Sequence, residues 1–172
     1  LTLAYIVCAM NVPVSIYTLA GHDDALFMHN AYKILKGEWL GDAYTQMTLA
    51  KGPGYSLFLA VNAVIGIPIT LSIALFYAFS CWLLSNTLIR LGLPAFVGLV
   101  LFTLMLFHPE ILPTRIIRDN IYPGLSLIVF AAIIDLFLLN QRRWFILFLY
   151  GGAIALFWLT REEGIWIIPA LS

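Results

Sequence analysis

The chain has 172 residues, of which 62% are hydrophobic and 10% are charged, and its mean hydropathy is +0.97. Soluble domains are nearer half apolar and a quarter charged, so this composition excludes an ordinary soluble domain. The formal net charge is zero, which argues against a nucleic-acid partner and against membrane binding through a polybasic surface.

Long uncharged runs alternate along the chain with short charged clusters. About 20 apolar residues cross a hydrocarbon core of about 30 Å, and within lipid only helices or a closed barrel pair all their backbone groups. Because the runs lack a period-2 alternation, we predict an all-α fold, a polytopic transmembrane helical bundle. The chain starts at Leu1 without a Met and stops inside an apolar run, so we interpret residues 1–172 as a fragment of one transmembrane domain.

The first predicted span covers residues 1–19, and an extracytoplasmic loop over 20–52 follows it. Within this loop, residues 25–36 have the pattern of a short amphipathic helix that lies along the membrane interface and ends at Gly37. Four residues at i, i+3, i+4 and i+7 form its apolar face: Met28, Ala31, Tyr32 and Leu35.

The remaining apolar runs predict five further spans, the last of them cut off by the end of the chain. They are 69–89, 95–112, 121–139, 144–159 and 165–172. The run 54–66 is only marginally long, so it is either a short span or a re-entrant segment. The number of spans predicts a multi-pass protein of the cell's inner or plasma membrane.

Almost all ionisable residues lie in the loop 20–52, around Arg90, in the segment 108–119, and in two clusters at 141–143 and 161–163. If 54–66 is a full crossing, the loop faces the opposite side from the other acidic clusters. If it is re-entrant, the loop, the 108–119 segment and the 161–163 cluster share one face. We favour the shared face, because it leaves only short, purely basic loops on the other side, as in cytoplasmic loops.

Carboxylates and cations gathered at a membrane edge suit a lipid-phosphate donor whose reactive head lies at the interface. A carboxylate acts there as a general base, and guanidinium groups bind a phosphate bidentately. The candidate catalytic residues are Asp23 and Asp24. The candidate substrate-binding residues are Lys51, Tyr55, Arg115, Arg118, Asp119, Arg161, Glu162 and Glu163. No cofactor is required, and the carboxylates leave a divalent metal possible.

Each of these motifs also has a purely structural interpretation. Asp23 or Asp24 could cap the helix over 25–36. The segment 115–119 could be a self-paired helix end, the cluster 161–163 could stop a span at the interface, and residues 51–54 could be a helix entry. The histidines lack any metal-ligand spacing, so we expect interfacial polar contacts from them.

The order of these motifs resembles the GT-C superfamily of integral membrane glycosyltransferases, such as the protein O-mannosyltransferases and the lipid A aminoarabinose transferases. A span ends in an acidic pair, here Gly21-His22-Asp23-Asp24, and a Lys-Pro-Pro-like entry follows, here Lys51-Gly52-Pro53-Gly54-Tyr55. Later come the segment Arg118-Asp119-Asn120 and the end Thr160-Arg161-Glu162-Glu163-Gly164. The chain departs from the family in reading Lys-Gly-Pro where the family has Lys-Pro-Pro.

The resemblance implies a GT-C-like bundle that transfers a sugar from a polyprenyl-phosphate donor to a glycan, lipid or protein acceptor on the extracytoplasmic face. It implies that the catalytic carboxylate of the first loop, which acts as the base, is Asp23 or Asp24. It further implies that Lys51, Arg115 and Arg161 hold the donor phosphate.

Two other functions fit the same sequence. A transporter or flippase of lipid-linked or small solutes would have its site near the bilayer midplane on buried ionisable residues. Only Asp135 lies well inside an apolar run, which disfavours transport. A non-catalytic membrane scaffold would tolerate neutralisation of Asp23 or Arg161.

Overall fold

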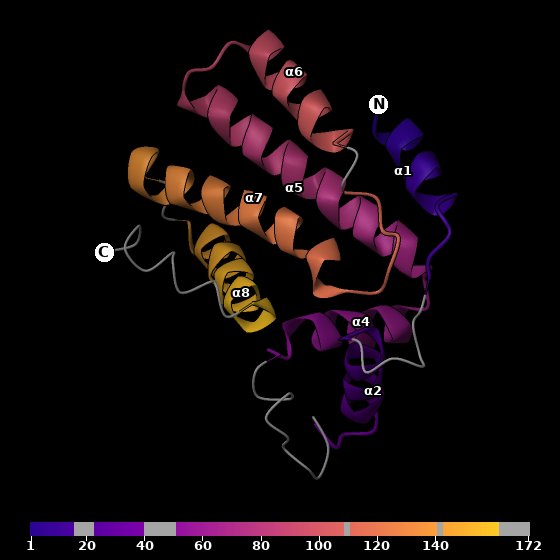
Figure 1. Cartoon of the computed structure of the whole chain (residues 1–172). Helices are drawn as coiled ribbons and strands as arrows, with labels where there is room; N and C mark the ends of the chain where they lie inside the picture. Colours follow the sequence, from indigo (N-terminus) through magenta and orange to yellow (C-terminus); the bar gives the residue numbers. More distant parts are fainter. Residues whose placement is uncertain (16–22, 40–50, 109–110, 141–142, 162–172) are drawn as a thin grey trace.

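The computed structural model describes residues 1–15, 23–39, 51–108, 111–140 and 143–161 (Figure 1). These residues form an all-helical fold, and the predicted fold class is confirmed at that level. The α-helices are α1 (Thr2–Met10), α2 (Asp23–Leu35), α4 (Gly54–Ile65), α5 (Ile69–Leu91), α6 (Ala95–Leu106), α7 (Tyr122–Ile133) and α8 (Trp144–Thr160). A 3-10 turn, η2 (Arg118–Asn120), precedes α7, and a π-helical segment, η3 (Ile134–Leu138), follows it.

Helix α5 is central to the packing, since α1, α6 and α7 all lie against it and α8 packs on the far side of α7 (Figure 1). Its small residues Ala74, Ala78 and Cys81 are buried, and they allow Tyr5 of α1 and Leu106 of α6 to approach closely. Helices α2 and α4 pack on one another at one end of this bundle, where α4 also contacts α8.

The first apolar run forms a shorter helix than the predicted span 1–19. Helix α1 ends at Met10, and Asn11 closes it by donating a side-chain hydrogen bond of 2.8 Å to the Val7 carbonyl. Pro13 then disfavours helical geometry at the residue before it and has no N–H to continue the ladder. The chain becomes extended, and the Ser15 N–H donates to the Thr114 carbonyl at 2.9 Å.

The amphipathic helix predicted over 25–36 is present as α2, which begins two residues earlier. Gly37 follows its last turn with a φ of +77°, the left-handed conformation that glycine adopts without strain. Beyond this turn Lys33 donates a hydrogen bond of 2.6 Å to Glu38. This hydrogen bond and the charge of Lys33 lower the pKa of the Glu38 carboxyl.

Helices occupy much of the other predicted runs, with two differences at their ends. Helix α6 ends at Leu106 rather than reaching 112, since a helix seldom continues up to a proline and Pro109 follows in the sequence. The run 121–139 is regular only to Ile133 and then widens into the π-helical segment η3. The predicted span 165–172 lies outside the described residues.

One helix of the described part of the chain, α5, is long and apolar enough to cross a membrane, by length and composition alone. The core helix of a soluble protein passes the same test. Helices α4, α6, α8 and the combined segment Tyr122–Leu138 are apolar but shorter. Large apolar side chains nevertheless face outward on α6 and α8, including Phe96 at 76%, Trp144 at 80% and Phe148 at 79% exposure.

A buried polar cluster joins α5, η3 and α8 at the end of the bundle away from α2 and α4. The Asp135 carboxylate is 2% exposed, and Arg90 Nη1 lies 3.1 Å from one of its oxygens and 3.3 Å from the other. The Tyr150 hydroxyl donates a hydrogen bond to the same carboxylate. Asp135, the one ionisable residue inside an apolar run, is therefore paired with a cation whose side chain is 36% exposed.

This pair predicts an asymmetric response to mutation. Arg90→Met leaves a buried, unpaired carboxylate and should lower the free energy of unfolding by about 3–5 kcal/mol. The double variant Arg90→Met/Asp135→Leu removes both charges and should regain most of that loss, which thermal unfolding in detergent would measure. A double variant as unstable as Arg90→Met would contradict a charge-pairing role for Asp135.

Candidate functional site

Three segments that are far apart in the sequence meet where α2 and α4 join the bundle. They are the start of α2, the stretch 51–55 that leads into α4, and the stretch 115–122 before and at the start of α7. The end of α8 closes the same region through Arg161. The ion pairs bring residues of the predicted loop, the 108–119 segment and the start of the 161–163 cluster into one region, and their location on one side of a membrane stays a prediction.

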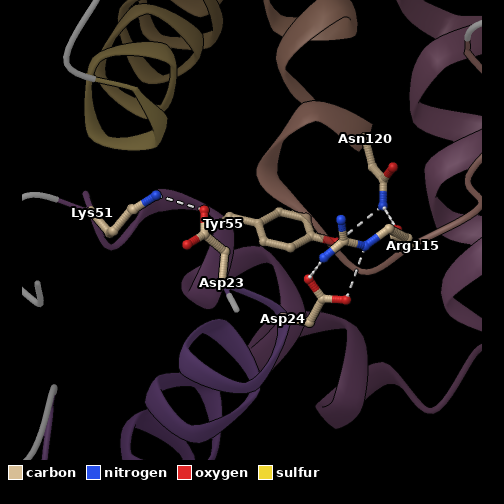
Figure 2. Close-up of polar contacts among 6 residues, drawn as sticks. All are labelled: Asp23, Asp24, Lys51, Tyr55, Arg115 and Asn120. Atoms are coloured by element: carbon tan, nitrogen blue, oxygen red, sulfur yellow. Dashed lines mark hydrogen bonds and ion pairs between the residues drawn. The ribbon is translucent and has the colours of Figure 1, made fainter. Parts of the chain in front are cut away.

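Asp24 is the buried member of the acidic pair. Its side chain is 0% exposed, and Arg115 holds it with two hydrogen bonds, 2.7 Å from Nη2 to Oδ1 and 3.3 Å from Nε to Oδ2 (Figure 2). A bidentate guanidinium–carboxylate contact fixes both position and orientation. This contact ties the first turn of α2 to the segment before α7.

Asp23 has a different cation and a different environment. The Lys51 ammonium donates a hydrogen bond of 2.6 Å to Asp23 Oδ2, and the two side chains are 22% and 34% exposed respectively (Figure 2). Both carboxylates are therefore bound by cations from outside α2, so neither is simply a helix cap. Of the two, Asp23 is the carboxylate that a second molecule can reach.

Tyr55 contacts both the apolar residues beneath the ion pairs, through its ring, and Asn120, through its hydroxyl. Its ring is buried and packs edge-on against Phe27 with 5.2 Å between ring centroids. The Asn120 side-chain amide lies 3.3 Å from the Tyr55 hydroxyl and also donates 2.6 Å to the backbone carbonyl of Arg115. Asn120 thereby links Tyr55 to Arg115, which forms the ion pair with Asp24.

Arg161 brings a third cation to this face at the end of α8. Its guanidinium lies 3.3 Å from Asp119 and 5.0 Å above the centroid of the Tyr122 ring. The Tyr122 ring in turn stacks on Phe157, one turn back on α8, at 4.8 Å. Stacking on an aromatic face orients a guanidinium, and Asp119, at 54% exposure, leaves this pair open to solvent.

The stretch leading into α4 lies against the end of α8 at backbone contact. A Cβ at Gly52 would be 2.1 Å from the Leu159 carbonyl oxygen, and a Cβ at Gly54 would be 2.5 Å from the Thr160 hydroxyl oxygen. Only residues without a side chain fit at these two positions. Lys51 and Arg161 each stand next in sequence to a residue of this contact, while their side chains pair with Asp23 and Asp119 respectively.

The other predicted site residues are less informative. Arg118 is half-buried in η2, and Glu162 and Glu163 lie outside the described residues. Among the residues that the structure describes, no group of three or more His, Cys, Asp and Glu side chains could hold a metal ion.

Sequence reasoning missed the roles of Asn120, Tyr122, Gly52 and Gly54. Gly52 was visible as the departure from the Lys-Pro-Pro pattern, Gly54 follows that pattern directly, and Asn120 is next to the predicted Asp119. Nothing in the sequence alone pointed to the stacking of Arg161 on Tyr122.

In comparisons with known proteins, no family model, no curated protein and no solved structure matched this chain.

The glycine contact predicts that small substitutions will be costly at two positions and harmless at a third. Gly52→Ala and Gly54→Ala should each lower the free energy of unfolding by about 1–3 kcal/mol, the usual cost of overpacking, because the atoms that they meet include backbone. Gly151→Ala on α8 is the matched control, since its Cβ would meet nothing within 4 Å. Equal stability of all three variants in thermal unfolding would contradict the close approach of residues 51–54 to α8.

Proposed function

We propose that this chain is the sugar-transfer part of a membrane glycosyltransferase. It would take a sugar from a polyprenyl-phosphate donor and pass it to an acceptor hydroxyl at the extracytoplasmic membrane face. The observation that carries the proposal is a partly exposed carboxylate, Asp23, which accepts a hydrogen bond of 2.6 Å from Lys51. A second cation, Arg161, directly follows Thr160, whose backbone lies against Gly54.

The contacts of the acidic pair favour Asp23 as the base. A general base must reach the proton that it takes, and Asp23 is 34% exposed while Asp24 is 0% exposed. Both oxygens of Asp24 are also occupied by Arg115. Asp24 and Arg115 then hold the start of α2 in place so that Asp23 faces the acceptor.

The three cations also differ in how well each could bind the donor phosphate. Arg115 is committed to Asp24, so Lys51 and Arg161 are the better candidates for the donor phosphate. An ammonium has three N–H donors, so Lys51 can bind a phosphate oxygen while it keeps Asp23. Arg161, oriented by Tyr122, can offer its guanidinium edge to the same phosphate.

The proposed step uses these groups in one displacement. The Asp23 carboxylate takes the proton of the acceptor hydroxyl, whose oxygen bonds to the anomeric carbon of the sugar. The bond from that carbon to the phosphate oxygen breaks as an oxocarbenium-like state forms. The leaving polyprenyl phosphate keeps the bonding electrons, and Lys51 and Arg161 stabilise its added charge. The step requires no cofactor, and a divalent metal at the phosphate stays a prediction.

A polytopic, GT-C-like bundle in the inner or plasma membrane remains part of this proposal. Support comes from the outward-facing apolar side chains of α6 and α8 and from the apolar character of the helices that are shorter than α5. Amphipathic helix α2 would lie at the extracytoplasmic interface, with Lys36 over the Tyr32 ring at 4.6 Å. Tyrosines are enriched at membrane–water interfaces, and a cation over an aromatic ring is attracted to it.

The transporter alternative rests on Asp135, and the contacts of this residue weaken it. Asp135 is held by Arg90 and Tyr150, so a solute would have to displace an existing buried ion pair. The scaffold alternative makes no use of a partly exposed Asp23–Lys51 pair. Both alternatives predict that Asp23 can be neutralised without loss of chemistry.

Asp23→Asn should lower sugar transfer by about 10²–10⁴-fold, the usual contribution of a general base. Expression and thermal unfolding should be unchanged, because Asp23 is partly exposed. Asp24→Asn should mainly destabilise the protein, since it breaks a buried pair. The measurement is transfer of labelled sugar from polyprenyl-phosphate donors to acceptors in membranes that contain the full-length protein.

Wild-type transfer by Asp23→Asn would show that this carboxylate is structural and would remove the proposed base. If the wild-type protein consumed no donor from a broad panel of sugars, the transporter and scaffold alternatives would move ahead.

Lys51→Met and Arg161→Met should each raise KM for the donor about tenfold or more, because each removes a charge-assisted contact to the phosphate. A Tyr122→Leu variant should have a smaller effect of the same kind, since it leaves Arg161 charged but loses the ring beneath it. Steady-state kinetics against donor concentration would measure these changes. Unchanged donor KM in both charge variants would assign Lys51 and Arg161 to structural ion pairs only.

A further inference from the structure

The ion pair between Asp119 and Arg161 differs from the other two ion pairs of the site in length and in exposure. Asp119 Oδ1 lies 3.3 Å from Arg161 Nη1, and the Asp119 side chain is 54% exposed. The other two pairs are 2.6 and 2.7 Å long, and their carboxylates, Asp23 and Asp24, are 34% and 0% exposed. Of the three carboxylates, Asp119 is therefore the one most open to water and the one farthest from its cation.

Tyr122 contacts the same guanidinium from a second direction. Arg161 Cζ lies 5.0 Å from the centroid of the Tyr122 ring, and this ring stacks on Phe157 of α8. Asp119 lies in η2 and Tyr122 begins α7, so one short stretch of chain supplies both the carboxylate and the ring. Because the ring attracts a cation without carrying a charge, Arg161 keeps a contact with this stretch when Asp119 releases it.

An exposed ion pair can exchange its anion at little cost. Water and salt screen such a pair, so it adds little to the stability of the fold. A phosphate offers a guanidinium a bidentate, charge-assisted contact in its place. Breaking the Arg115–Asp24 pair would instead leave a fully buried carboxylate without its cation. Of these two arginines, Arg161 is thus the one that can pass from a carboxylate of the chain to an anionic ligand.

The charge of the phosphate changes during the proposed transfer. In the donor the phosphate is a diester with a single negative charge. After the bond to the sugar breaks, it is a monoester that carries about −1.5 to −2 charges at neutral pH. The cations that stabilise this added charge in the transition state also bind the product more tightly than the donor. A carboxylate of the chain that takes Arg161 back would favour release of the product.

We propose that Asp119 competes with the phosphate for Arg161. It holds the guanidinium beside Tyr122 before the donor binds, and it takes the guanidinium back when the polyprenyl phosphate leaves. This inference rests on the proposed function for the identity of the anion. Asp119 then opposes phosphate binding, unlike the substrate-binding role that the sequence predicts for it, and no bond forms or breaks at its carboxylate.

Binding of a polyprenyl phosphate without a sugar tests this competition in the full-length protein in lipid nanodiscs. Asp119→Asn should lower the dissociation constant about two- to sixfold, the factor by which a competing ion pair of ordinary exposed strength raises it. Glu38→Gln is the matched control and should leave the constant unchanged. Glu38 is also an exposed carboxylate, 2.6 Å from Lys33, and it belongs to none of the three ion pairs of the site.

A second pair of variants separates competition for Arg161 from a general loss of negative charge. In an Arg161→Met background, Asp119→Asn should give no further gain in binding, because the cation for which the carboxylate competes is gone. With Arg161 present, Asp119→Asn should lower the inhibition constant of the product by the same factor as the dissociation constant. Single-turnover transfer should be unchanged, since Asp119 takes no part in the displacement.

Three results would overturn the inference. Unchanged or weaker binding by Asp119→Asn, with normal binding and transfer by the wild-type protein, would make the pair structural. An equal gain in the Arg161→Met background would show that Asp119 acts through its charge alone and not through Arg161. Loss of single-turnover transfer in Asp119→Asn would make Asp119 a catalytic group or a metal ligand.

The binding assay also separates this inference from the proposed function, because it requires no sugar transfer. Tighter binding by Asp119→Asn in a protein that transfers no sugar would refute the glycosyltransferase and keep the exchange of anions at Arg161. Failure of the wild-type protein to bind any polyprenyl phosphate would refute both.

Discussion

The ion pair between Asp24 and Arg115 is the contact on which the candidate site depends. It is buried on the carboxylate side and bidentate, and it joins α2 to the segment before α7 across 91 residues of sequence. Without it a buried carboxylate would be unpaired, a state that proteins rarely tolerate. Because Asp23 precedes Asp24 directly, fixing one residue fixes the direction of the other. In the acidic pair, Asp24 thus fixes the start of α2, and Asp23 is the proposed base. Asn120 supports the Asp24–Arg115 pair, since its side-chain amide donates to the Arg115 carbonyl.

Much of the fold could be predicted from the sequence because apolar periodicity and helix stop signals are local. Helix α2 is an example, since its face, its length and its end at Gly37 all follow from neighbouring residues. The apolar pattern predicts one span over 1–19, whereas α1 ends at Met10, ahead of Pro13, and the Ser15 N–H donates to the Thr114 carbonyl. The π-helical segment contains Asp135, whose contacts with Arg90 and Tyr150 join residues far apart in the sequence, so the sequence pattern did not predict it.

The candidate site was predicted as a set of residues but not as an arrangement. Charge clustering identified Asp23, Asp24, Lys51, Arg115, Asp119 and Arg161, and these six form three ion pairs with one another. The choice of partner within the set could not be read from spacing, since it depends on how α4 and α8 pack. The distinction between Asp23 and Asp24 likewise required burial, because neighbouring residues of the same type are equivalent in a sequence.

The contact of Gly52 and Gly54 with Leu159 and Thr160 has a consequence for how related sequences can vary. A larger residue at position 52 or 54 cannot be accepted unless the end of α8 moves away, so the two segments must change together. Substitutions at 52 and 54 should therefore covary with substitutions at 159 and 160, as pairs in spatial contact do. A relative that reads Lys-Pro-Pro at this point would have its α8 end set further back. Such a relative would differ from this chain both at positions 52–54 and at positions 159–160.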